Sequence, residues 1–304
     1  MKKVLKYTSY SLLAIVGILF VVYLVFSFRT NAAMNEAYLI EPENLPVLID
    51  SAAIARGKHI VESRGCTDCH GASLEGRVFI DDFAMGKVIA TNLTGGKGGV
   101  QKSYSDADWV RAIRHGIHRS GRPLLIMPSN EYFYLGDEDL AGVIAYLKSL
   151  PPIDNPLPAN NIGPLARVLY PLGKLEQLIP AKMIDHQARR PVTPAAAVTP
   201  EYGEYVAVSC QGCHYPNMEG GPSAVPGYPP APDLTRNGSL ARWTEADFIQ
   251  AMRSGKTVDG KELNNAYMPW QVFGKMNETE LRAIWAYLQT LPKSDSPHLS
   301  SSSN

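Results

Sequence analysis

Two short segments decide the fold: Cys-Thr-Asp-Cys-His at residues 66–70 and Cys-Gln-Gly-Cys-His at residues 210–214. Together they use all 4 cysteines of the 304-residue chain. Cys-x-x-Cys-His is the attachment signature of c-type haem, because two thiols one helical turn apart can bond the two vinyl groups of one porphyrin while the adjacent imidazole binds the iron. The pattern predicts two covalently bound haems. The expected thioether residues are Cys66, Cys69, Cys210 and Cys213, and the expected proximal iron ligands are His70 and His214.

Other uses of paired cysteines fit this chain less well. Zinc sites built from two Cys-x-x-Cys pairs usually place the pairs about 15–20 residues apart, whereas Cys210 lies 144 positions after Cys66. A thioredoxin-like redox pair needs a βαβ context and no following histidine. Structural disulfides suit an exported chain, but they leave both histidines unexplained. Haem attachment accounts for the cysteines and the histidines together.

The two motifs begin two halves that repeat each other, which gives an internal comparison. Each half continues with Asn/Asp-Leu-Thr, a Ser/Thr-x-x-Asp box, Arg-x-Gly, Met-Pro and Ala-Tyr-Leu. The matched segments begin at Asn92 and Asp233, Ser105 and Thr244, Arg114 and Arg253, Met127 and Met268, and Ala145 and Ala286. Features present in both halves are therefore candidates for a shared chemistry.

The Met-Pro pairs provide candidates for the second axial ligand of each iron. Met127 and Met268 are each followed by proline at matching places in the two halves, and a thioether is an axial haem ligand that raises the reduction potential. A single methionine is more often a core residue, but the matched position favours ligation. Met85 is the main competitor in the first half, and it has no methionine counterpart in the second.

The remaining histidines lack histidine counterparts in the repeat. His115 and His118 have the helical spacing of metal ligands, but the second half carries Ser254 and Thr257 at these places, so we expect surface residues. Three further histidines have neither a histidine counterpart nor a ligand cluster: His59, His186 and His298. Three basic residues are candidates for contacts with haem propionates: Arg77, Arg122 and Lys261.

The N-terminal segment has the length of a membrane span. Residues 10–28 contain no charged side chain, and a helix of this length is roughly 28 Å long, close to the roughly 30 Å of a hydrocarbon core. A cleaved signal peptide has a shorter apolar core and a small-x-small site, and Asn31-Ala32-Ala33 lacks the first small residue. We therefore expect an uncleaved anchor. Lys2 and Lys3 precede the span, so the body is expected on the periplasmic side of a bacterial inner membrane.

Charge divides along the chain in the same way. The formal net charge is zero, from 29 basic and 29 acidic side chains, but residues 1–33 hold four of the basic groups and no acid. The remainder carries 25 basic against 29 acidic groups, a net of −4. A nucleic-acid binder needs a basic stripe, so the expected partners are the membrane and redox proteins that donate and accept electrons, without nucleic acid.

Hydrophobic periodicity is helical in both halves, and no run alternates long enough to predict a sheet. We expect three helices in each half: one before the cysteine pair, one after the Ser/Thr-x-x-Asp box and one at the end of the half, which in the second half begins at Asn277-x-x-Glu280. Residues 151–200 hold 10 of the 23 prolines, which predicts an extended connector with one short turn near residues 165–172. The predicted fold class is all-α, with an N-terminal transmembrane helix followed by two tandem haem domains.

The expected division of the chain follows from these features. The expected segments are a cytoplasmic tip and anchor at 1–33, a first haem domain at 34–151, a proline-rich connector at 152–199, a second haem domain at 200–292 and a disordered tail at 293–304.

The chain resembles a membrane-anchored dihaem cytochrome c with two class I-type domains. The resemblance covers roughly residues 50–292 and depends on both Cys-x-x-Cys-His motifs, the segment at 92–94, the segment at 243–248 and the two Met-Pro pairs. The chain is also similar to cytochrome subunits of periplasmic alcohol or aldehyde dehydrogenases, which typically have three haem domains where this chain has two. The resemblance implies that the first and last helices of each domain cross, and that the protein transfers electrons without substrate chemistry.

The expected function is a periplasm-facing carrier of single electrons between a dehydrogenase or quinol-oxidising donor and a downstream cytochrome or terminal oxidase. His and Met ligation would leave no open position on the iron. One alternative is a haem enzyme, either a peroxidase or an oxidiser of sulfur compounds. A peroxidase needs a displaceable or absent distal ligand, and the sulfur enzyme of the familiar kind needs a spare cysteine. The other alternative is a redox sensor, although no signalling domain is recognisable.

Overall fold

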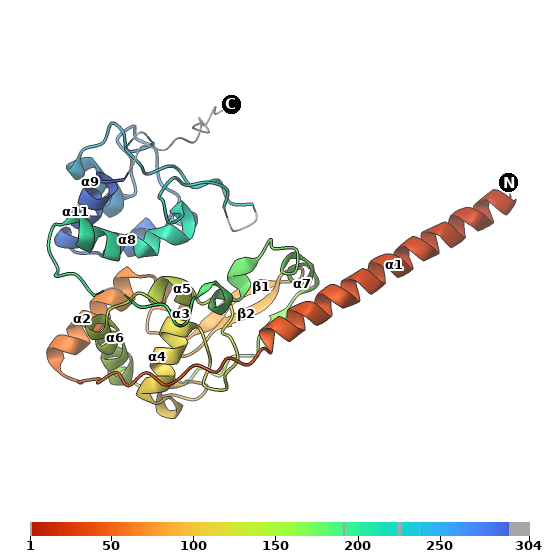
Figure 1. The fold of residues 1–304 in the computed structure, drawn as a ribbon, viewed down its shortest axis with the longest axis horizontal. Helices are drawn as coiled ribbons and strands as arrows, with labels where there is room; N and C mark the ends of the chain where they lie inside the picture. Colours follow the sequence, from red (N-terminus) through yellow and green to blue (C-terminus); the bar gives the residue numbers. More distant parts are fainter. Residues whose placement is uncertain (1, 191, 224–226, 237, 292–304) are drawn as a thin grey trace.

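The computed structural model describes residues 2–190, 192–223, 227–236 and 238–291, so the tail predicted to be disordered and His298 lie outside the described residues. Figure 1 shows one long helix, α1, that projects from a body in which two groups of helices lie beside each other. The α-helices are α1 (Lys2–Met34), α2 (Ser51–Ser63), α3 (Cys66–His70), α4 (Asp106–His115), α5 (Ser129–Tyr132), α6 (Asp137–Ser149), α7 (Pro164–Leu169), α8 (Pro200–His214), α9 (Glu245–Ser254), α10 (Trp270–Phe273) and α11 (Glu278–Leu288). The 3₁₀ helices are η1 (Gln101–Ser103), η2 (Glu176–Leu178) and η3 (Pro180–Met183), and the strands are β1 (Arg77–Asp82), β2 (Gly86–Ala90) and β3 (Asn161–Ile162).

Capping residues set the beginnings of the main helices. Complete capping boxes begin at Ser105 before α4, at Thr244 before α9 and at Asn277 before α11. In each box the cap side chain accepts a hydrogen bond from a backbone N–H that the first turn leaves free, and the acidic side chain three residues later accepts one from the backbone N–H of the cap residue. The sequence prediction of helices at these positions is confirmed.

The first and last helices of each domain cross at a glycine. In the first domain α2 packs on α6, and a Cβ added to Gly57 would lie 1.9 Å from the carbonyl oxygen of Gly142. In the second domain α8 packs on α11, and a Cβ on Gly203 would lie 1.9 Å from the carbonyl oxygen of Ala283. Only glycine permits so close an approach of two backbones. The crossing that the family resemblance implied is present in both domains.

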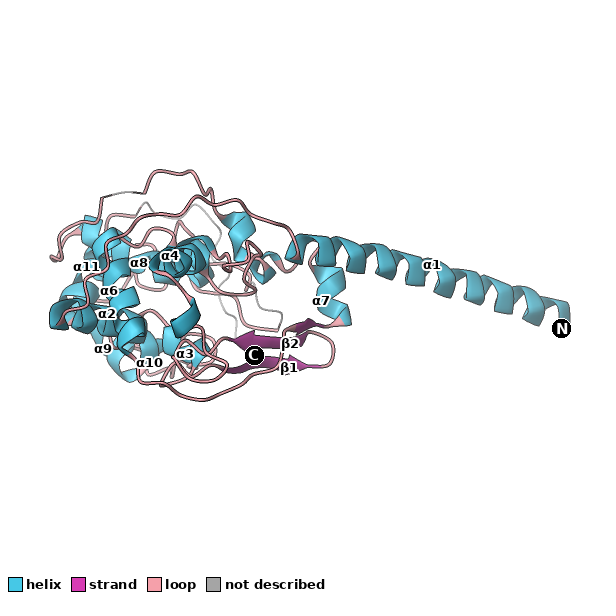
Figure 2. Ribbon diagram, turned by 90° about the horizontal axis from the view of Figure 1, so that it is seen from below, coloured by secondary structure: helices cyan, strands magenta, loops and turns pink. Residues whose placement is uncertain are grey.

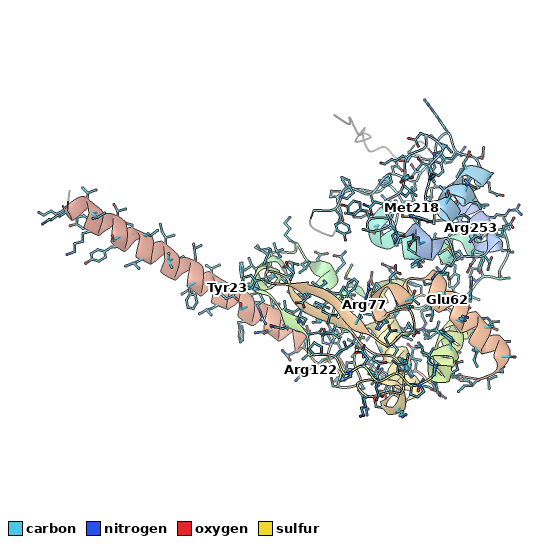
Figure 3. All side chains as sticks on the ribbon, turned by 180° about the vertical axis from the view of Figure 1, so that it is seen from behind. Tyr23, Glu62, Arg77, Arg122, Met218 and Arg253 are labelled. Carbon is cyan, nitrogen blue, oxygen red and sulfur yellow. The ribbon has the colours of Figure 1, made fainter. Side chains whose placement is uncertain are left out.

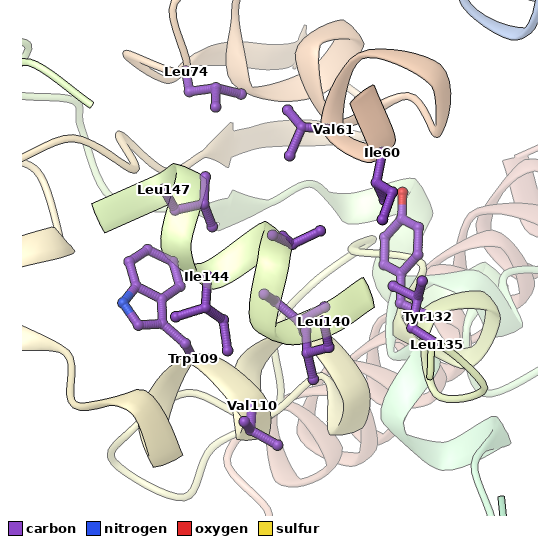
Figure 4. Packing of buried hydrophobic residues seen from close by; sticks show 12 residues of the cluster. Ile60, Val61, Leu74, Trp109, Val110, Tyr132, Leu135, Leu140, Ile144 and Leu147 are labelled. Atoms are coloured by element: carbon purple, nitrogen blue, oxygen red, sulfur yellow. The ribbon is translucent and has the colours of Figure 1, made fainter. Parts of the chain in front are cut away.

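Each domain has its own apolar cluster. Figure 4 shows the first, in which Ile60 and Val61 of α2 and Leu140 and Ile144 of α6 gather with Trp109 of α4. The second cluster is built from the matching helices α8, α9 and α11 together with buried methionines. Trp109 and Phe248, which follow the capping boxes of α4 and α9 at matching places, are both buried in these clusters.

The expectation of an all-α fold needs one correction, because the first domain carries a small sheet. Figure 2 shows the β1–β2 hairpin at the edge of the body, near the foot of α1. β2 lies between β1 and β3, and both pairings are antiparallel. β3 comes from the connector, about 70 residues after β2. A short hairpin that depends on so distant a partner leaves little periodic signal in the sequence.

The connector is more structured than an extended chain. It contains β3, α7, η2 and η3, and a third apolar cluster joins Val88 of β2 and Ile117 to Leu178 and Ile179 of the connector. Ala33 and Met34 at the end of α1 pack against the same cluster. The connector between residues 161 and 181 therefore packs on the first domain and on the foot of α1.

Candidate haem sites

The first cysteine motif forms the short helix α3, which begins after Gly65 in the left-handed conformation. Nδ1 of His70 lies 2.7 Å from the carbonyl oxygen of Thr91, the residue just before the Asn-Leu-Thr segment. A carbonyl acceptor at Nδ1 fixes that nitrogen as the N–H donor and leaves Nε2 with the lone pair that binds a metal. Burial lowers the pKa of His70, which keeps the ring neutral, as an iron ligand requires.

One cavity joins the predicted ligands of the first domain. Its volume is about 220 Å³, far above the roughly 10–15 Å³ that a single water needs. Cys66, Cys69, His70 and Met127 all line it, and apolar residues such as Trp109 form much of the remaining wall. An apolar cavity with two thiols, one imidazole and one thioether has the donor set and the walls that a haem c requires.

The second domain repeats the arrangement of the histidine. Nδ1 of His214 lies 2.9 Å from the carbonyl oxygen of Pro232, which directly precedes the Asp-Leu-Thr segment as Thr91 precedes its counterpart. His214 is buried, and burial lowers its pKa. Cys210 and Met268 both pack against the second apolar cluster, whereas Cys213 is exposed. The structure thus orients the two histidines in the same way.

The loops before the two Met-Pro pairs have matching backbone hydrogen bonds. In the first domain Leu124 N–H donates to the carbonyl of Gly116, at 2.6 Å, and in the second Leu263 N–H donates to that of Gly255, at 2.7 Å. Both glycines end a helix in the left-handed conformation. After the loop, the residue two places beyond each methionine donates to the methionine carbonyl at 2.7 Å. The repeat is therefore structural at the candidate ligands.

The thiols are not activated for catalysis. Burial raises the pKa of Cys66 and of Cys210 to about 12, and that of Cys69 to about 11. Cysteines that act as nucleophiles or in thiol–disulfide exchange have a lowered pKa. The four cysteines, all within the described residues, form no disulfide with one another. Their raised pKa values therefore give no sign of a thiol activated as a nucleophile.

The two cysteine motifs approach each other across the domain interface. Arg64, two residues before Cys66, donates through Nη1 to the carbonyl oxygen of Val206 and to Oγ of Ser209, the latter at 2.9 Å. Ser209 directly precedes Cys210. Arg64 is buried and also lines the first cavity. One guanidinium group thus lies beside both attachment motifs.

A carboxyl group lies at the same interface. Glu131 of α5 packs against the second motif so closely that a Cβ on Gly212 would lie 2.3 Å from its Oε1. Burial raises the pKa of Glu131 to about 8, although the charge of Arg64 acts in the opposite direction. The sequence contained no periodic or repeat signal for Arg64 or Glu131, because the interface is not part of the repeat.

The expectation that His115 and His118 are surface residues is wrong for His115 and in part for His118. His115 is buried, with Nε2 2.8 Å from Oε1 of Glu43 and Nδ1 3.0 Å from Nδ1 of His186. His118 is half-buried and borders the first cavity. Comparison with the second half missed this because Glu43 and His186 lie outside the repeated segments.

Glu43 is the centre of a charged network at the C-terminal end of α4. It accepts hydrogen bonds from Arg114, at 2.7 Å, and from both Nη atoms of Arg190, at 3.0 and 2.7 Å. Although burial raises the pKa of Glu43, the hydrogen bond to His115 and the two arginines outweigh it and lower the pKa to about 2. Among the described residues, no group of three or more potential ligands is arranged to hold a metal ion. The network therefore fastens the segment after α1 and the end of the connector to α4.

The remaining candidates lie away from the first cavity or at its margin. Met85 packs against the third cluster and does not line the first cavity. Arg77 is exposed and donates to the carbonyl oxygen of Asp68. The side chains of Arg122 and Lys261 are exposed. Figure 3 places Arg77 near the middle of the body and Arg122 below it.

Comparison with known proteins agrees with this geometry. The family model described as Cytochrome c matches residues 54–151 and residues 201–292. The chain is 27% identical over 282 residues to the cytochrome c subunit of a quinone alcohol dehydrogenase from Gluconacetobacter polyoxogenes, which covers 80% of this chain and 57% of the relative.

Two further relatives are cytochrome subunits of sugar or sugar-acid dehydrogenases. The fructose dehydrogenase cytochrome subunit of Gluconobacter japonicus is 25% identical over 279 residues, 82% of this chain and 55% of that protein. The gluconate 2-dehydrogenase cytochrome c subunit of Pantoea cypripedii is 25% identical over 243 residues, 68% of this chain and 52% of that protein. The chain thus spans little more than half the length of these curated relatives.

Proposed function

The chain belongs to the cytochrome c family, and on that premise we propose that it is a membrane-anchored carrier with two haems c. It takes single electrons from a dehydrogenase or quinol-oxidising donor and passes them to a downstream cytochrome or terminal oxidase. The relatives named as subunits of alcohol, fructose and gluconate dehydrogenases support a dehydrogenase as the donor. Catalysis on the reduced substrate belongs to the partner subunit.

The observation that carries the proposal is the meeting of Cys66, Cys69, His70 and Met127 in one apolar cavity. The two cysteines would hold a haem by thioether bonds, His70 would bind the iron through Nε2, and Met127 would be the second axial ligand. A haem iron with these ligands changes charge by one electron and has no position open to oxygen or peroxide. Cys210, Cys213, His214 and Met268 would do the same in the second domain.

The protein's own contribution is to fix the ligands. The carbonyl oxygens of Thr91 and Pro232 hold the imidazole rings in one orientation, and the buried helices around them exclude water. A ligand set that is held before and after electron transfer needs little reorganisation. These features favour a carrier over a peroxidase, which needs a distal ligand that leaves.

The domain interface is the proposed route between the two haems. Arg64 contacts the residue before Cys210 and lies two residues before Cys66, so the two attachment motifs border the same contact. We assign this contact as the path between domains, whichever domain receives the electron first.

The anchor is α1, the one helix in the described residues that is long and apolar enough to cross a membrane. Lysines precede its apolar part and the acidic body follows it, which favours a cytoplasmic N-terminus. A reporter enzyme that folds only in the periplasm, fused after residue 291, is expected to be active. If instead a reporter that folds only in the cytoplasm is active at the same position and the periplasmic reporter is inactive, this orientation is contradicted.

Spectroscopy tests the haem assignment. The purified chain is expected to contain two haems per polypeptide, and the near-infrared charge-transfer band of ferric His/Met haem should account for both. Met127→Ala and Met268→Ala should each remove half of this band, lower the potential of one domain and allow carbon monoxide to bind its ferrous iron.

Met85→Ala is the matched control, because Met85 lies in the first domain but packs away from the cavity. It should leave the spectrum unchanged. Loss of half of the band in Met85→Ala, with Met127→Ala unchanged, would overturn the ligand assignment. A high-spin haem in the unaltered chain would overturn the carrier in favour of a haem enzyme.

A further inference from the structure

The connector helix α7 lies against a part of α1 that belongs to the apolar span. The half-buried or buried residues of α1 share one helical face: Tyr23, Phe26, Ser27, Thr30, Ala33 and Met34. α7 packs on this part of α1, and Figure 3 shows Tyr23 where α1 meets the body. Tyr23 lies five residues before Phe28, the last residue of the uncharged stretch. The face of α1 that the body covers therefore begins roughly 8 Å inside the end of the apolar stretch, at about 1.5 Å per residue.

Specific hydrogen bonds fix α7 at this level. Oγ1 of Thr30, which is fully buried, donates to the carbonyl oxygen of Arg167 at 2.9 Å. Nη1 of Arg167 in turn donates to Oδ1 of Asn31 at 2.6 Å. The body is thus fastened to the foot of the anchor and does not hang from a flexible linker.

The β1–β2 hairpin is tied to α7 and presents its tip beside it. Leu165 N–H donates to the carbonyl of Ala84, and Gly163 N–H donates to that of Met85, both at 2.9 Å. Phe83, at the tip, is 93% exposed. Figure 2 shows α7 and the hairpin tip together at the end of the body from which α1 projects.

Exposed apolar side chains gather at this end of the body. Besides Phe83, Leu165 of α7 is 45% exposed and Leu172 just after it is 52% exposed. The two acids of the hairpin have local partners: Asp81 pairs with Lys87 at 3.0 Å, and Oδ1 of Asp82 accepts hydrogen bonds from two backbone N–H groups of the turn. An apolar surface with a few charged and hydrogen-bonded groups at this level matches the headgroup region of a bilayer.

We propose that Phe83, Leu165 and Leu172 form a membrane seat, a surface that enters the headgroup region of the phospholipid bilayer around the foot of α1. The inference rests on the proposed anchoring by α1 and goes beyond it, because a single span alone leaves the body free to tilt. The occupant is lipid, because α7 and the hairpin continue the surface of a helix that is itself in the membrane. The seat sets the orientation of both domains relative to the membrane plane.

Nitroxide labels test the seat in the full chain, reconstituted in phosphatidylethanolamine–phosphatidylglycerol vesicles. In the holoprotein the four native cysteines are bound to haem, so an introduced cysteine is the one free thiol, and the ferrous low-spin irons are diamagnetic. The variants are Phe83→Cys and Leu165→Cys in the seat, Leu19→Cys in the span and Val258→Cys in the second domain. The side chain of Val258 is 52% exposed. The accessibility of each label to oxygen and to a water-soluble nickel chelate gives its depth.

If the seat exists, the labels at 83 and 165 should be more accessible to oxygen than to the chelate. Their depth should lie between that of the label at 19 and that of the label at 258. Labels at 83 and 165 as accessible to the chelate as the label at 258, with the label at 19 in the bilayer, would overturn the seat and leave the anchor intact. A label at 19 open to the chelate would overturn the anchor and with it the seat. If the labels at 83 and 165 are shielded from both reagents, equally in vesicles and in detergent, protein and not lipid covers these residues, and the seat is overturned.

Discussion

Nε2 of His59 lies 2.8 Å from Oε2 of Glu280 and joins the first helix of the first domain to the last helix of the second. Glu280 is only 4% exposed, and its other role is in the capping box of α11. The hydrogen bond to Glu280 raises the pKa of His59, and contact with His59 lowers the pKa of Glu280 despite its burial. Below the raised pKa of His59 and above the lowered pKa of Glu280, the two side chains form an ion pair across the domain interface.

The first prediction is that the attachment of the two domains weakens at high and at low pH. Because the pKa of His59 is raised above 6.5, its contribution is complete below 6.5 and is lost as the pH rises through the raised value. Because the pKa of Glu280 is lowered below 4.5, its contribution is complete above 4.5 and is lost as the pH falls through the lowered value.

His59→Gln should therefore lose about 1 kcal/mol of domain coupling near pH 6, given the partial exposure of His59, and should remove the loss at high pH. The measurement is small-angle scattering with limited proteolysis of the connector between pH 4 and 9. Lys58→Gln is the control, since its pairing with Glu62 is exposed and within one helix. A His59→Gln variant that keeps the pH dependence of the unaltered chain would show that this pair does not couple the domains.

The second prediction concerns the potentials of both proposed haems. Arg64 is buried beside both attachment motifs, and a positive charge there stabilises the ferrous state more than the ferric state. Arg64→Met should lower both potentials, each by an amount on the order of 1 kcal/mol, or roughly 40 mV for a one-electron couple. Redox titration followed by optical spectroscopy measures both.

Arg56→Met is the matched control for Arg64, because Arg56 lies on the same helix but pairs with Glu138 at the surface. Its potentials should equal those of the unaltered chain. If Arg64→Met shifts one domain only, the guanidinium group is not shared between the motifs. If it shifts neither, the interface does not tune the haems.

The third prediction concerns Glu43. Its pKa is lowered from 4.5 to about 2, so its stabilising contribution is complete above pH 4.5 and is lost as the pH falls from 4.5 towards 2. Glu43→Gln leaves the fully buried Arg114 with only Asp137 and the carbonyl of Leu135 as partners. At pH 7 it should lower the free energy of unfolding by about 2–3 kcal/mol.

Guanidinium unfolding followed by far-ultraviolet circular dichroism measures this loss. Glu41→Gln, two residues away and exposed, should be neutral within about 0.5 kcal/mol. Near pH 3 the difference between Glu43→Gln and the unaltered chain should shrink. Equal loss in both glutamine variants would mean that the network contributes nothing specific.

How far the sequence predicts this structure depends on whether a feature is local or repeated. Capping boxes act within four residues, so the starts of α4, α9 and α11 followed directly from Ser105, Thr244 and Asn277. The candidate ligands were found because the same residues occur at matching places in both halves. The position of Met127 in the wall of the first cavity is consistent with that prediction.

Features that join distant, unrepeated segments could not be predicted in this way. The Glu43 network brings together residues that are 71 positions apart in the chain, Glu43 with Arg114 and His115 with His186. β2 pairs with β3 of the connector, and Arg64 bonds Ser209, 145 positions later. Such contacts depend on tertiary packing, because neither member of a pair has a periodic or motif signal of its own.

The fourth prediction concerns the glycines at the helix crossings. Gly57→Ala or Gly203→Ala places a Cβ 1.9 Å from a backbone carbonyl oxygen of the opposing helix, so the helices must separate. Each substitution should lower the free energy of unfolding of its own domain by about 3 kcal/mol, the upper end of the range for overpacking.

Gly142→Ala is the matched control, because its Cβ would meet its nearest neighbour at 3.1 Å and the second domain already carries Ala283 at the equivalent position. It should change stability by less than about 1 kcal/mol. Guanidinium unfolding followed by haem absorption should show the loss as an earlier transition that carries half of the amplitude, because one domain holds one of the two proposed haems. A Gly142→Ala variant as unstable as Gly57→Ala would contradict the close approach at Gly57 as the cause.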